Sequence, residues 1–226
     1  MGLALSLALA GVVVWPWLDP RFSYYVDDGV THAMRLALFD HLLRRGEWFP
    51  RWWPDLGLGY GYPLLNYYSP GVYYLGEVFH LLGVSTYRAL HLVAICSALL
   101  GAAGAFVLGA VVFRSAPAAV VLAGAYVGAP YPFVTNLYNR SAFPEALGLG
   151  VLPWLLTAGW VAVQRPSSLS RMSLAVALAG LVLVHSLTAL IGAGLLALWL
   201  GAALLDLPPA RRGGGARAAV VGVGLG

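Results

Sequence analysis

Long apolar runs separated by short polar breaks dominate the pattern of this chain. One crossing of a bilayer takes about 20 apolar residues, so we interpret these runs as membrane-spanning helices. The runs cover residues 2–18, 88–113, 116–134, 144–163, 172–185 and 187–206, and another begins near residue 218. We therefore predict an all-α fold, a polytopic transmembrane helical bundle that forms one domain over residues 1–226, with transmembrane helices throughout 88–206.

The two ends of the chain need separate interpretation. The first run is short and contains Ala-Leu-Ala at residues 8–10, which also suits a signal peptide. No basic residue precedes it, however, and Trp15 and Trp17 resemble interfacial anchors, so we favour a retained first transmembrane helix over residues 1–18. Residues 218–226 are apolar up to the last residue, and we expect them to start another helix in a longer protein.

Residues 70–84 form an apolar stretch with one polar stripe. Tyr73, Glu77 and His80 recur at positions i, i+4 and i+7, which share one face of a helix. We predict an interfacial or re-entrant helix that lies in the membrane interface or lines a cavity.

Arginines in the short breaks predict the orientation of the bundle, because basic residues are retained on the cytoplasmic side. All six of these arginines can be cytoplasmic if residues 1–18 enter from the inside and residues 70–84 do not cross. They are Arg114, Arg165, Arg171, Arg211, Arg212 and Arg217. This topology places the long loop 19–69, the connection at 135–143 and the break at His185 together outside. We expect a multi-pass protein of the cell membrane with its active face outside the cytoplasm.

The composition agrees with a membrane protein. Hydrophobic residues make up 60% of the chain, charged residues only 10%, and the mean hydropathy is +0.80. The net charge of +4 comes from 13 basic residues, all arginine. Because they are spread over the breaks between spans, we expect no nucleic-acid partner. The single cysteine, Cys96, excludes an internal disulfide and a cysteine metal site.

Six of the nine acids lie between residues 19 and 55, in the long outer loop. Asp28, His32 and Arg35 recur there at spacings of four and three, so they share one face of a predicted amphipathic helix. Asp27 or Asp28 can serve as its N-cap. An acid, an imidazole and a guanidinium on one face can abstract a proton and hold an anion. The alternative is a capped helix with a solvated stripe of ion pairs. The predicted buried face of this helix consists of Leu36, Phe39, Leu42 and Leu43.

Glycines and aromatic residues fill the second half of the loop. Gly57, Gly59 and Gly61 lack the flanking strand and helix of a nucleotide-binding fingerprint, so we predict a tight loop that displays its tyrosines. The aromatic residues have two interpretations, a belt at the level of the lipid headgroups or platforms for a sugar or lipid. They are Trp48, Trp52, Trp53, Tyr60, Tyr62, Tyr67 and Tyr68.

Three further ionisable residues fall in the predicted outer breaks. Arg140 runs against the positive-inside bias, so we expect it to meet an anion. Glu145 lies in the first turn of a predicted helix, where the helix dipole favours an acid. His185 interrupts two apolar runs and is either a functional group or a neutral histidine bonded to a backbone carbonyl.

Four motifs carry a resemblance to a known family. They read DDGVTHAMR, GEWFPRWWPDLGLGYGYPLLNYYSP, NRSAFPEALG and VHSLTAL. Through these motifs, the chain resembles the membrane region of bacterial proteins labelled 6-pyruvoyl-tetrahydropterin-synthase-related or YfhO-like. The resemblance extends over most of residues 1–206. That family in turn resembles the GT-C class of polytopic glycosyltransferases.

The resemblance implies an enzyme that transfers a sugar from a polyprenyl-phosphate donor to an envelope acceptor. It implies an acid of the first outer loop as base or metal ligand, which here is Asp28, with Asp27 as the alternate. Adjacent aspartates replace the spaced pair of many members, so a divalent metal is not favoured. His32 would orient the acceptor, and Arg140 with Arg35 would bind the donor phosphate. The expected substrate-binding residues are Glu145, His185, Tyr67 and Tyr68.

Two other classes of function stay open at this point. A lipid or solute transporter also places ionisable residues against a polar cavity, but it should show internal repeats, and none is evident. A non-catalytic scaffold for envelope assembly is the third hypothesis. The sugar, the acceptor and any partner subunits cannot be deduced from these residues.

Overall fold

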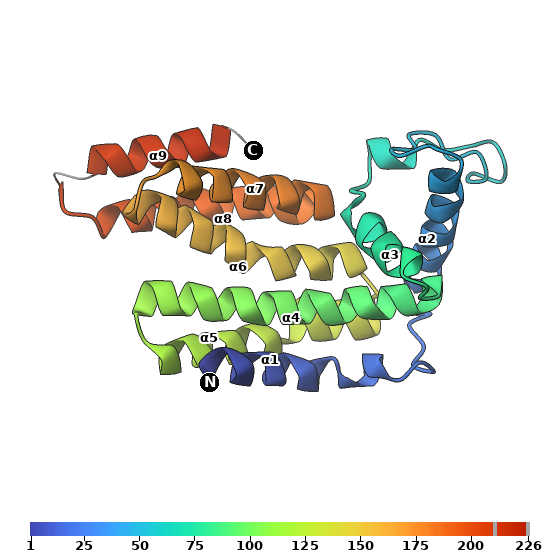
Figure 1. Ribbon diagram of the computed structural model, residues 1–226, viewed down its shortest axis with the longest axis horizontal. Coiled ribbons are helices and arrows are strands. Elements are labelled where there is room, and N and C mark those ends of the chain that lie inside the picture. The colour runs from blue at the N-terminus through green and yellow to red at the C-terminus, as the bar shows by residue number, and fades with distance from the viewer. Residues whose placement is uncertain (210–211, 225–226) are drawn as a thin grey trace.

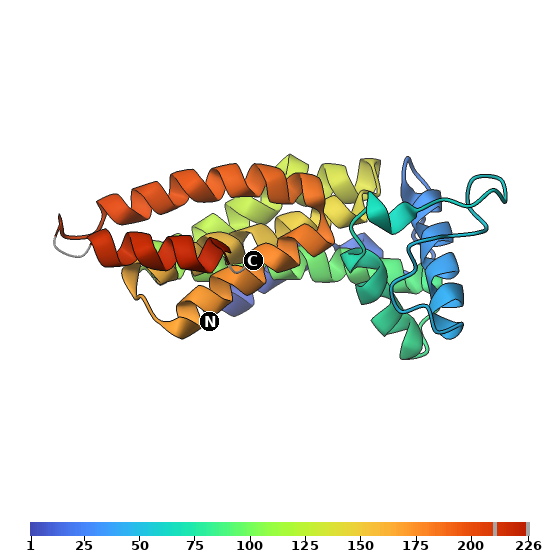
Figure 2. The same cartoon turned by 90° about the horizontal axis from the view of Figure 1, so that it is seen from above.

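In the computed structural model, which describes residues 1–209 and 212–224, most helices run alongside one another on the long axis of the molecule (Figures 1 and 2). At one end of this bundle, α2, α3 and the loop between them form a cap (Figure 1). The bundle helices are α1 (Gly2–Val13), α4 (Thr86–Phe113), α5 (Ala116–Gly128), α6 (Phe143–Gln164), α7 (Ser168–Val184), α8 (Ser186–Leu205) and α9 (Arg212–Gly224). The cap helices are α2 (Gly29–Arg44) and α3 (Gly71–Leu81). The predicted all-α fold is confirmed over the described residues.

Four helical stretches are long and apolar enough to cross a membrane. They are Thr86–Phe113, Ala116–Asn139, Phe143–Gln164 and Ser186–Leu205. Each corresponds to a predicted run. The apolar helices α1 and α7 are shorter. These lengths and compositions indicate a multi-pass membrane protein.

The start of the chain differs from the prediction. The first helix ends at Val13, and Trp15–Leu18 forms a 3₁₀ turn, η1, around Pro16. Proline lacks the N–H that would continue the α-helix. Trp15 is 71% exposed, as an interfacial anchor should be, but Trp17 is fully buried, so its predicted anchor role is wrong. The Trp17 ring packs against the rings of Phe22, Tyr24, His91, Tyr138 and Phe143.

Small residues allow the long helices to approach closely. A Cβ atom placed on Gly104 of α4 would lie 2.6 Å from the indole nitrogen of Trp154 in α6. Trp154 in turn donates a hydrogen bond to the carbonyl oxygen of Leu100, at 3.0 Å. Glycine at such crossings replaces side-chain volume with van der Waals contact between helices, which is how apolar helices associate in lipid.

The connection predicted at residues 135–143 is mostly helical. After α5, the segment Pro130–Asn139 forms a π-helix, η3, and only residues 140–142 connect it to α6. Pro130 and Pro132 lack backbone N–H groups, which removes ordinary α-helical hydrogen bonds here. The wider π-turn continues the span, so Arg140 follows its last turn directly.

Two of the three residues in the predicted polar stripe of α3 are buried inside the protein, and the third, His80, is partly exposed. Tyr73 is fully buried and Glu77 is 3% exposed. Both face α2, where His32 and Asp40 lie. The helix therefore uses its polar stripe to hold the cap together.

The glycine-rich segment forms the predicted tight loop. Gly57, Gly59 and Gly61 all have φ between +61° and +87°, and main-chain hydrogen bonds between Trp53 and Tyr62 close the turn. The structure departs from the predicted aromatic set at Trp53, which is 1% exposed and stacks on Phe39.

The end of the chain begins its helix earlier than predicted. The last helix, α9, starts at Arg212 and not near residue 218. Arg211, which we predicted on the cytoplasmic side, and residues 225–226 lie outside the described residues.

Glu77 provides a test of the cap. Burial raises the pKa of this carboxyl, and the negative charge of Asp40 raises the pKa further. A raised carboxyl pKa stabilises the fold at acidic pH, and the contribution is lost as the pH rises from about 4.5 through the folded-state pKa. Glu77→Gln should therefore reduce the loss of stability that accompanies a rise in pH above about 4.5. Thermal unfolding of the detergent-solubilised protein across this range measures the effect.

The exposed Glu47 supplies the control, since Glu47→Gln should leave the pH profile unchanged. If Glu77→Gln loses stability with rising pH as steeply as the wild type, Glu77 does not hold its proton in the fold.

Candidate functional site

The candidate site lies where the start of α2 meets the start of α6. The backbone N–H of Asp28 donates a hydrogen bond to the carbonyl oxygen of Arg140, at 3.1 Å. The hydroxyl of Ser141 donates to the carbonyl oxygen of Tyr24, at 2.7 Å. Two segments more than one hundred residues apart are thereby joined through their backbones.

The turn before α2 presents a carboxylate to solvent. Asp27 has a φ of +41°, and Asp28 occupies the N-cap position, one of the two predicted. The Asp28 side chain is exposed and makes no capping hydrogen bond. Gly29 is required at the next position, because a Cβ there would lie 1.8 Å from the carbonyl oxygen of Tyr24.

Behind Asp28, a hydrogen-bonded network connects α2 to α3. Nδ1 of His32 lies 3.1 Å from the hydroxyl of Tyr73, and a guanidinium nitrogen of Arg35 lies 3.5 Å from the same hydroxyl. The Arg35 guanidinium also lies over the ring of Tyr68, 4.6 Å from its centroid. The structure therefore brings two members of the predicted triplet, His32 and Arg35, together with two tyrosines.

Burial fixes the protonation of this network. Burial, reinforced by the charge of Arg35, lowers the pKa of His32 to about 3, so the imidazole is neutral at physiological pH. Burial raises the pKa of Tyr73, which therefore keeps its proton. Since Arg35 can only donate, the Tyr73 hydroxyl accepts from Arg35, and one proton joins the Tyr73 hydroxyl and Nδ1 of His32.

His32 is only 1% exposed, which changes its predicted role. A buried imidazole beneath the helix surface cannot contact an acceptor directly. It instead orients Tyr73, and through Tyr73 it positions Arg35.

The charge of Arg35 is not neutralised locally. No ion pair in the described part of the chain includes Arg35. Asp28 lies close enough that its negative charge raises the pKa of Tyr68, after the larger effect of burial. A guanidinium held over an aromatic ring beside an exposed carboxylate can engage an anionic ligand.

Arg140 meets the anion that the sequence predicted for it, and that anion is Glu145. One guanidinium nitrogen, Nη1, lies 2.7 Å from Glu145 Oε2 and 2.7 Å from Asn136 Oδ1. The Tyr131 hydroxyl donates to Glu145 Oε1, at 2.5 Å. These bonds use Nη1 alone, so Nη2 and Nε of Arg140 make no hydrogen bond with the described residues.

His185 caps a helix. Its Nδ1 accepts the backbone N–H of Thr188, at 3.3 Å, and lies 2.7 Å from the Thr188 hydroxyl. The partner is thus an N–H of α8 and not the carbonyl that we considered. A Cβ placed on Gly148 would lie 3.1 Å from the Cβ of His185, which locates His185 one turn along α6 from Glu145.

The two predicted substrate tyrosines border a pocket next to this network. Tyr67 is 73% exposed, whereas Tyr68 is half-buried under Arg35. A pocket of about 250 Å³ extends from both tyrosines to Val182 and Leu183 at the end of α7. It is mainly apolar and lies between the loop and the bundle.

Sequence reasoning missed several members of the site. Tyr131 and Asn136 hold the Arg140–Glu145 pair, but both lay inside a predicted apolar span or its break. They precede Arg140 by nine and four residues, and this spacing indicates contact with Arg140 only once the π-helix is known. The sequence predicts Tyr73 on a polar stripe, but it does not predict that the partner of Tyr73 is His32 of α2.

Within the described residues, no group of three or more histidine, cysteine or acidic side chains is arranged to hold a metal ion. The chemistry available from these residues is proton abstraction by a carboxylate and binding of an anion by arginine.

No protein-family model, curated protein or solved structure matches this chain. The family resemblance of the four motifs therefore stays a prediction, and the function is argued from the site.

Gly29 tests whether the close approach of the two segments shapes the site. Gly29→Ala should displace the Tyr24 carbonyl and lower the free energy of unfolding by about 1–3 kcal/mol. It should also speed hydrogen exchange of the Asp28 amide, which loses its bond to Arg140. The control is Gly11→Ala in α1, where an added Cβ meets nothing within 4 Å. Equal thermal stability of both variants would contradict the close approach.

Proposed function

We propose that this protein is a membrane glycosyltransferase of the GT-C type, which transfers a sugar from a polyprenyl-phosphate donor to an envelope acceptor. The observation that carries the proposal is the position of Asp28. Its carboxylate is exposed and makes no capping bond, and its charge acts on Tyr68, the ring that lies under the Arg35 guanidinium. The Asp28 backbone N–H donates to the carbonyl oxygen of Arg140, which brings that arginine to the same end of α2. Glycosyl transfer to a hydroxyl needs this combination of a base and a positive charge for the leaving phosphate.

In the proposed reaction, Asp28 takes the proton from an acceptor hydroxyl. The acceptor oxygen attacks the anomeric carbon from the side opposite the phosphate, with inversion. The bond from that carbon to the phosphate oxygen breaks, and its electron pair leaves with the polyprenyl phosphate. The products are the glycoside and the polyprenyl phosphate.

Two arginines support the departing phosphate. Arg35 is positioned by Tyr73 and Tyr68 and carries a charge that no described carboxylate neutralises. Arg140 keeps two donor groups free while Glu145 fixes its orientation. A planar, permanently charged guanidinium suits this task because it binds phosphate oxygens in pairs.

The lipid part of the donor has an adjacent apolar surface. The pocket bordered by Tyr67, Tyr68, Val182 and Leu183 continues from the ring under Arg35 to the end of α7. A prenyl chain could lie there with its phosphate at Arg35. Glu145 and His185 do not border this pocket; they lie at the starts of α6 and α8.

The proposal also assigns the faces of the membrane. The short-loop arginines Arg114, Arg165 and Arg171 lie at the end of the bundle opposite the cap (Figure 1). By the positive-inside bias that end is cytoplasmic, so the site faces outward.

Loss of the base gives the first functional test. In lipid nanodiscs supplied with a panel of polyprenyl-phosphate sugars, Asp28→Asn should lower turnover by at least about 100-fold. Asp27→Asn and the exposed loop variant Asp55→Asn should retain turnover. Addition of EDTA to the wild type determines whether a divalent metal takes part. Turnover that persists in Asp28→Asn but disappears in Asp27→Asn would transfer the role to Asp27.

Absence of turnover with every donor, together with equal donor binding by wild type and Asp28→Asn, would contradict the enzyme. That result would favour a transporter or a non-catalytic scaffold.

Removal of the Arg35 charge should weaken binding of the polyprenyl-phosphate donor. Arg35→Gln should raise the KM for the donor about tenfold, which corresponds to roughly 1.4 kcal/mol for one lost charge-assisted contact. Arg51→Gln, at an exposed loop position, serves as the control. An unchanged KM in Arg35→Gln would remove Arg35 from the proposed donor site.

A further inference from the structure

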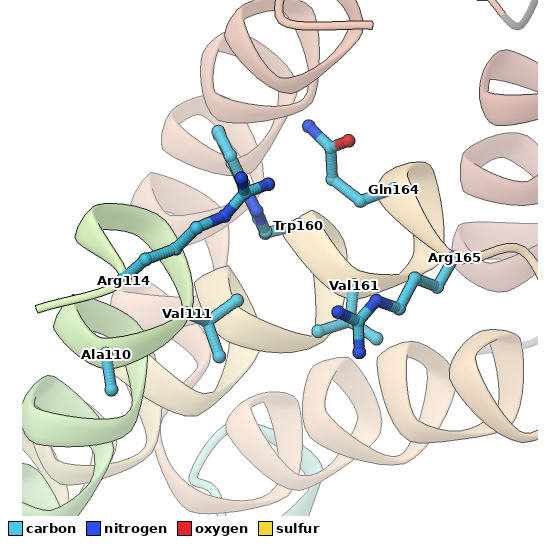
Figure 3. A pocket seen from close by; sticks show the side chains of 7 residues that line it. All are labelled: Ala110, Val111, Arg114, Trp160, Val161, Gln164 and Arg165. Atoms are coloured by element: carbon cyan, nitrogen blue, oxygen red, sulfur yellow. The ribbon is translucent and has the colours of Figure 1, made fainter.

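A second pocket lies between the carboxyl ends of α4 and α6, at the end of the bundle opposite Asp28 (Figures 1 and 3). Its volume is about 310 Å³. Two guanidinium groups, an amide and an indole border it, and small apolar side chains complete its wall. The residues of interest are Arg114, Arg165, Gln164, Trp160, Val111 and Val161.

The two arginines are placed by the ends of their helices. Arg114 directly follows α4 in a left-handed conformation, with a φ of +52°, and Arg165 directly follows α6. Figure 3 shows both side chains reaching into the space between these helices, where Val111 and Val161 lie. No ion pair among the described residues includes either guanidinium.

Among the described residues, the one acid at this end of the bundle is Asp206, and its bond goes to Gln164 at the edge of the pocket. Asp206 accepts a hydrogen bond from the side-chain amide of Gln164, at 2.9 Å. That amide also donates to the carbonyl oxygen of Ala203, at 3.4 Å. Asp206 therefore orients Gln164 at the edge of the pocket and leaves the positive charge of the two arginines uncompensated.

The charge of the whole chain is distributed unevenly between the two ends. Eight of the nine acids precede residue 146 and belong to the cap end, and Asp206 is the ninth. The opposite end carries five described arginines, Arg114, Arg165, Arg171, Arg212 and Arg217. Such an end is attracted to a leaflet that contains anionic lipids. The carboxyl ends of α4 and α6 carry partial negative charge themselves, so an anion in the pocket depends on the arginines.

An apolar groove continues from the pocket along α6. Val161 borders both the pocket and a groove of about 460 Å³ between α6 and α7. Trp154 and Ala158 of α6 and Ala177 of α7 also line this groove. Trp160 packs against Trp199, with ring centroids 5.3 Å apart, and tryptophan is typical of the headgroup level of a bilayer. A ligand that fits both parts has an anionic head and an apolar chain.

We propose that this pocket is a binding site for an anionic phospholipid. Arg114 and Arg165 bind the phosphate, and the indole of Trp160 contacts the glycerol region. One acyl chain lies in the groove between α6 and α7. The lipid thereby links the ends of α4 and α6, and the site is independent of the reaction at Asp28.

Phosphatidylglycerol and phosphatidylcholine with matched acyl chains are the probes. Binding to the detergent-purified protein is followed by native mass spectrometry. Phosphatidylglycerol should bind more tightly, and Arg114→Gln with Arg165→Gln should weaken it about 30-fold, since each basic residue beside an anionic lipid contributes roughly fivefold. Arg171→Gln with Arg217→Gln is the matched control at the same end and should change binding less than about threefold.

A second variant tests the acyl chain. Ala177→Phe fills the groove and should weaken long-chain phosphatidylglycerol while leaving dihexanoyl phosphatidylglycerol unaffected. Equal affinity of the wild type for phosphatidylglycerol and phosphatidylcholine would overturn the proposal. A preference for phosphatidylglycerol that survives in the double variant Arg114→Gln with Arg165→Gln would overturn it too. Full displacement by millimolar inorganic phosphate would also overturn it, because the site would then bind a free anion and not a lipid.

Discussion

The attachment of the first long loop to the start of α6 is the constraint on which the rest of the structure depends. Two hydrogen bonds, from Asp28 to the Arg140 carbonyl and from Ser141 to the Tyr24 carbonyl, make this attachment. The buried Trp17 ring stabilises the attachment by packing against rings from both segments, those of Phe22, Tyr24 and Phe143. Without this docking, the acid of α2 and the arginine before α6 would belong to separate surfaces. With it, a loop and a bundle form one site.

The two arginines of that site are held in different ways. Arg140 is held by Glu145, Asn136 and Tyr131, so its position is fixed while part of its hydrogen-bonding capacity stays open. Arg35 is held by tyrosines, which orient it without removing its charge. The first arrangement favours precise geometry and the second favours attraction of an anion. In the proposed reaction, this combination would both bind the donor phosphate and let it leave.

Hydropathy predicted most of the bundle because a membrane span depends on a long, simple pattern. Helical spacing identified His32 and Arg35, which both contact Tyr73, but it could not show that His32 is buried while Asp28 is exposed. Spacing could not show that Trp17 and Trp53 are buried, since belts and cores use the same aromatic residues. It could not show that Tyr73 and Glu77 face α2, because a polar stripe does not reveal its partner. The contacts of Arg140 depend on a π-helix that two prolines make possible but that no periodicity indicates.

The most direct test of the account is a cross-link between the two segments of the site. With Cys96→Ser as background, Asp28→Cys and Arg140→Cys place two thiols on residues whose backbones are hydrogen-bonded, close to the roughly 4.4–6.8 Å between Cα atoms that a disulfide spans. The account predicts rapid disulfide formation under mild oxidation, and none for Asp28→Cys with Arg165→Cys at the opposite end. Failure of the first pair to cross-link, while both thiols react with a maleimide, would contradict the joined site.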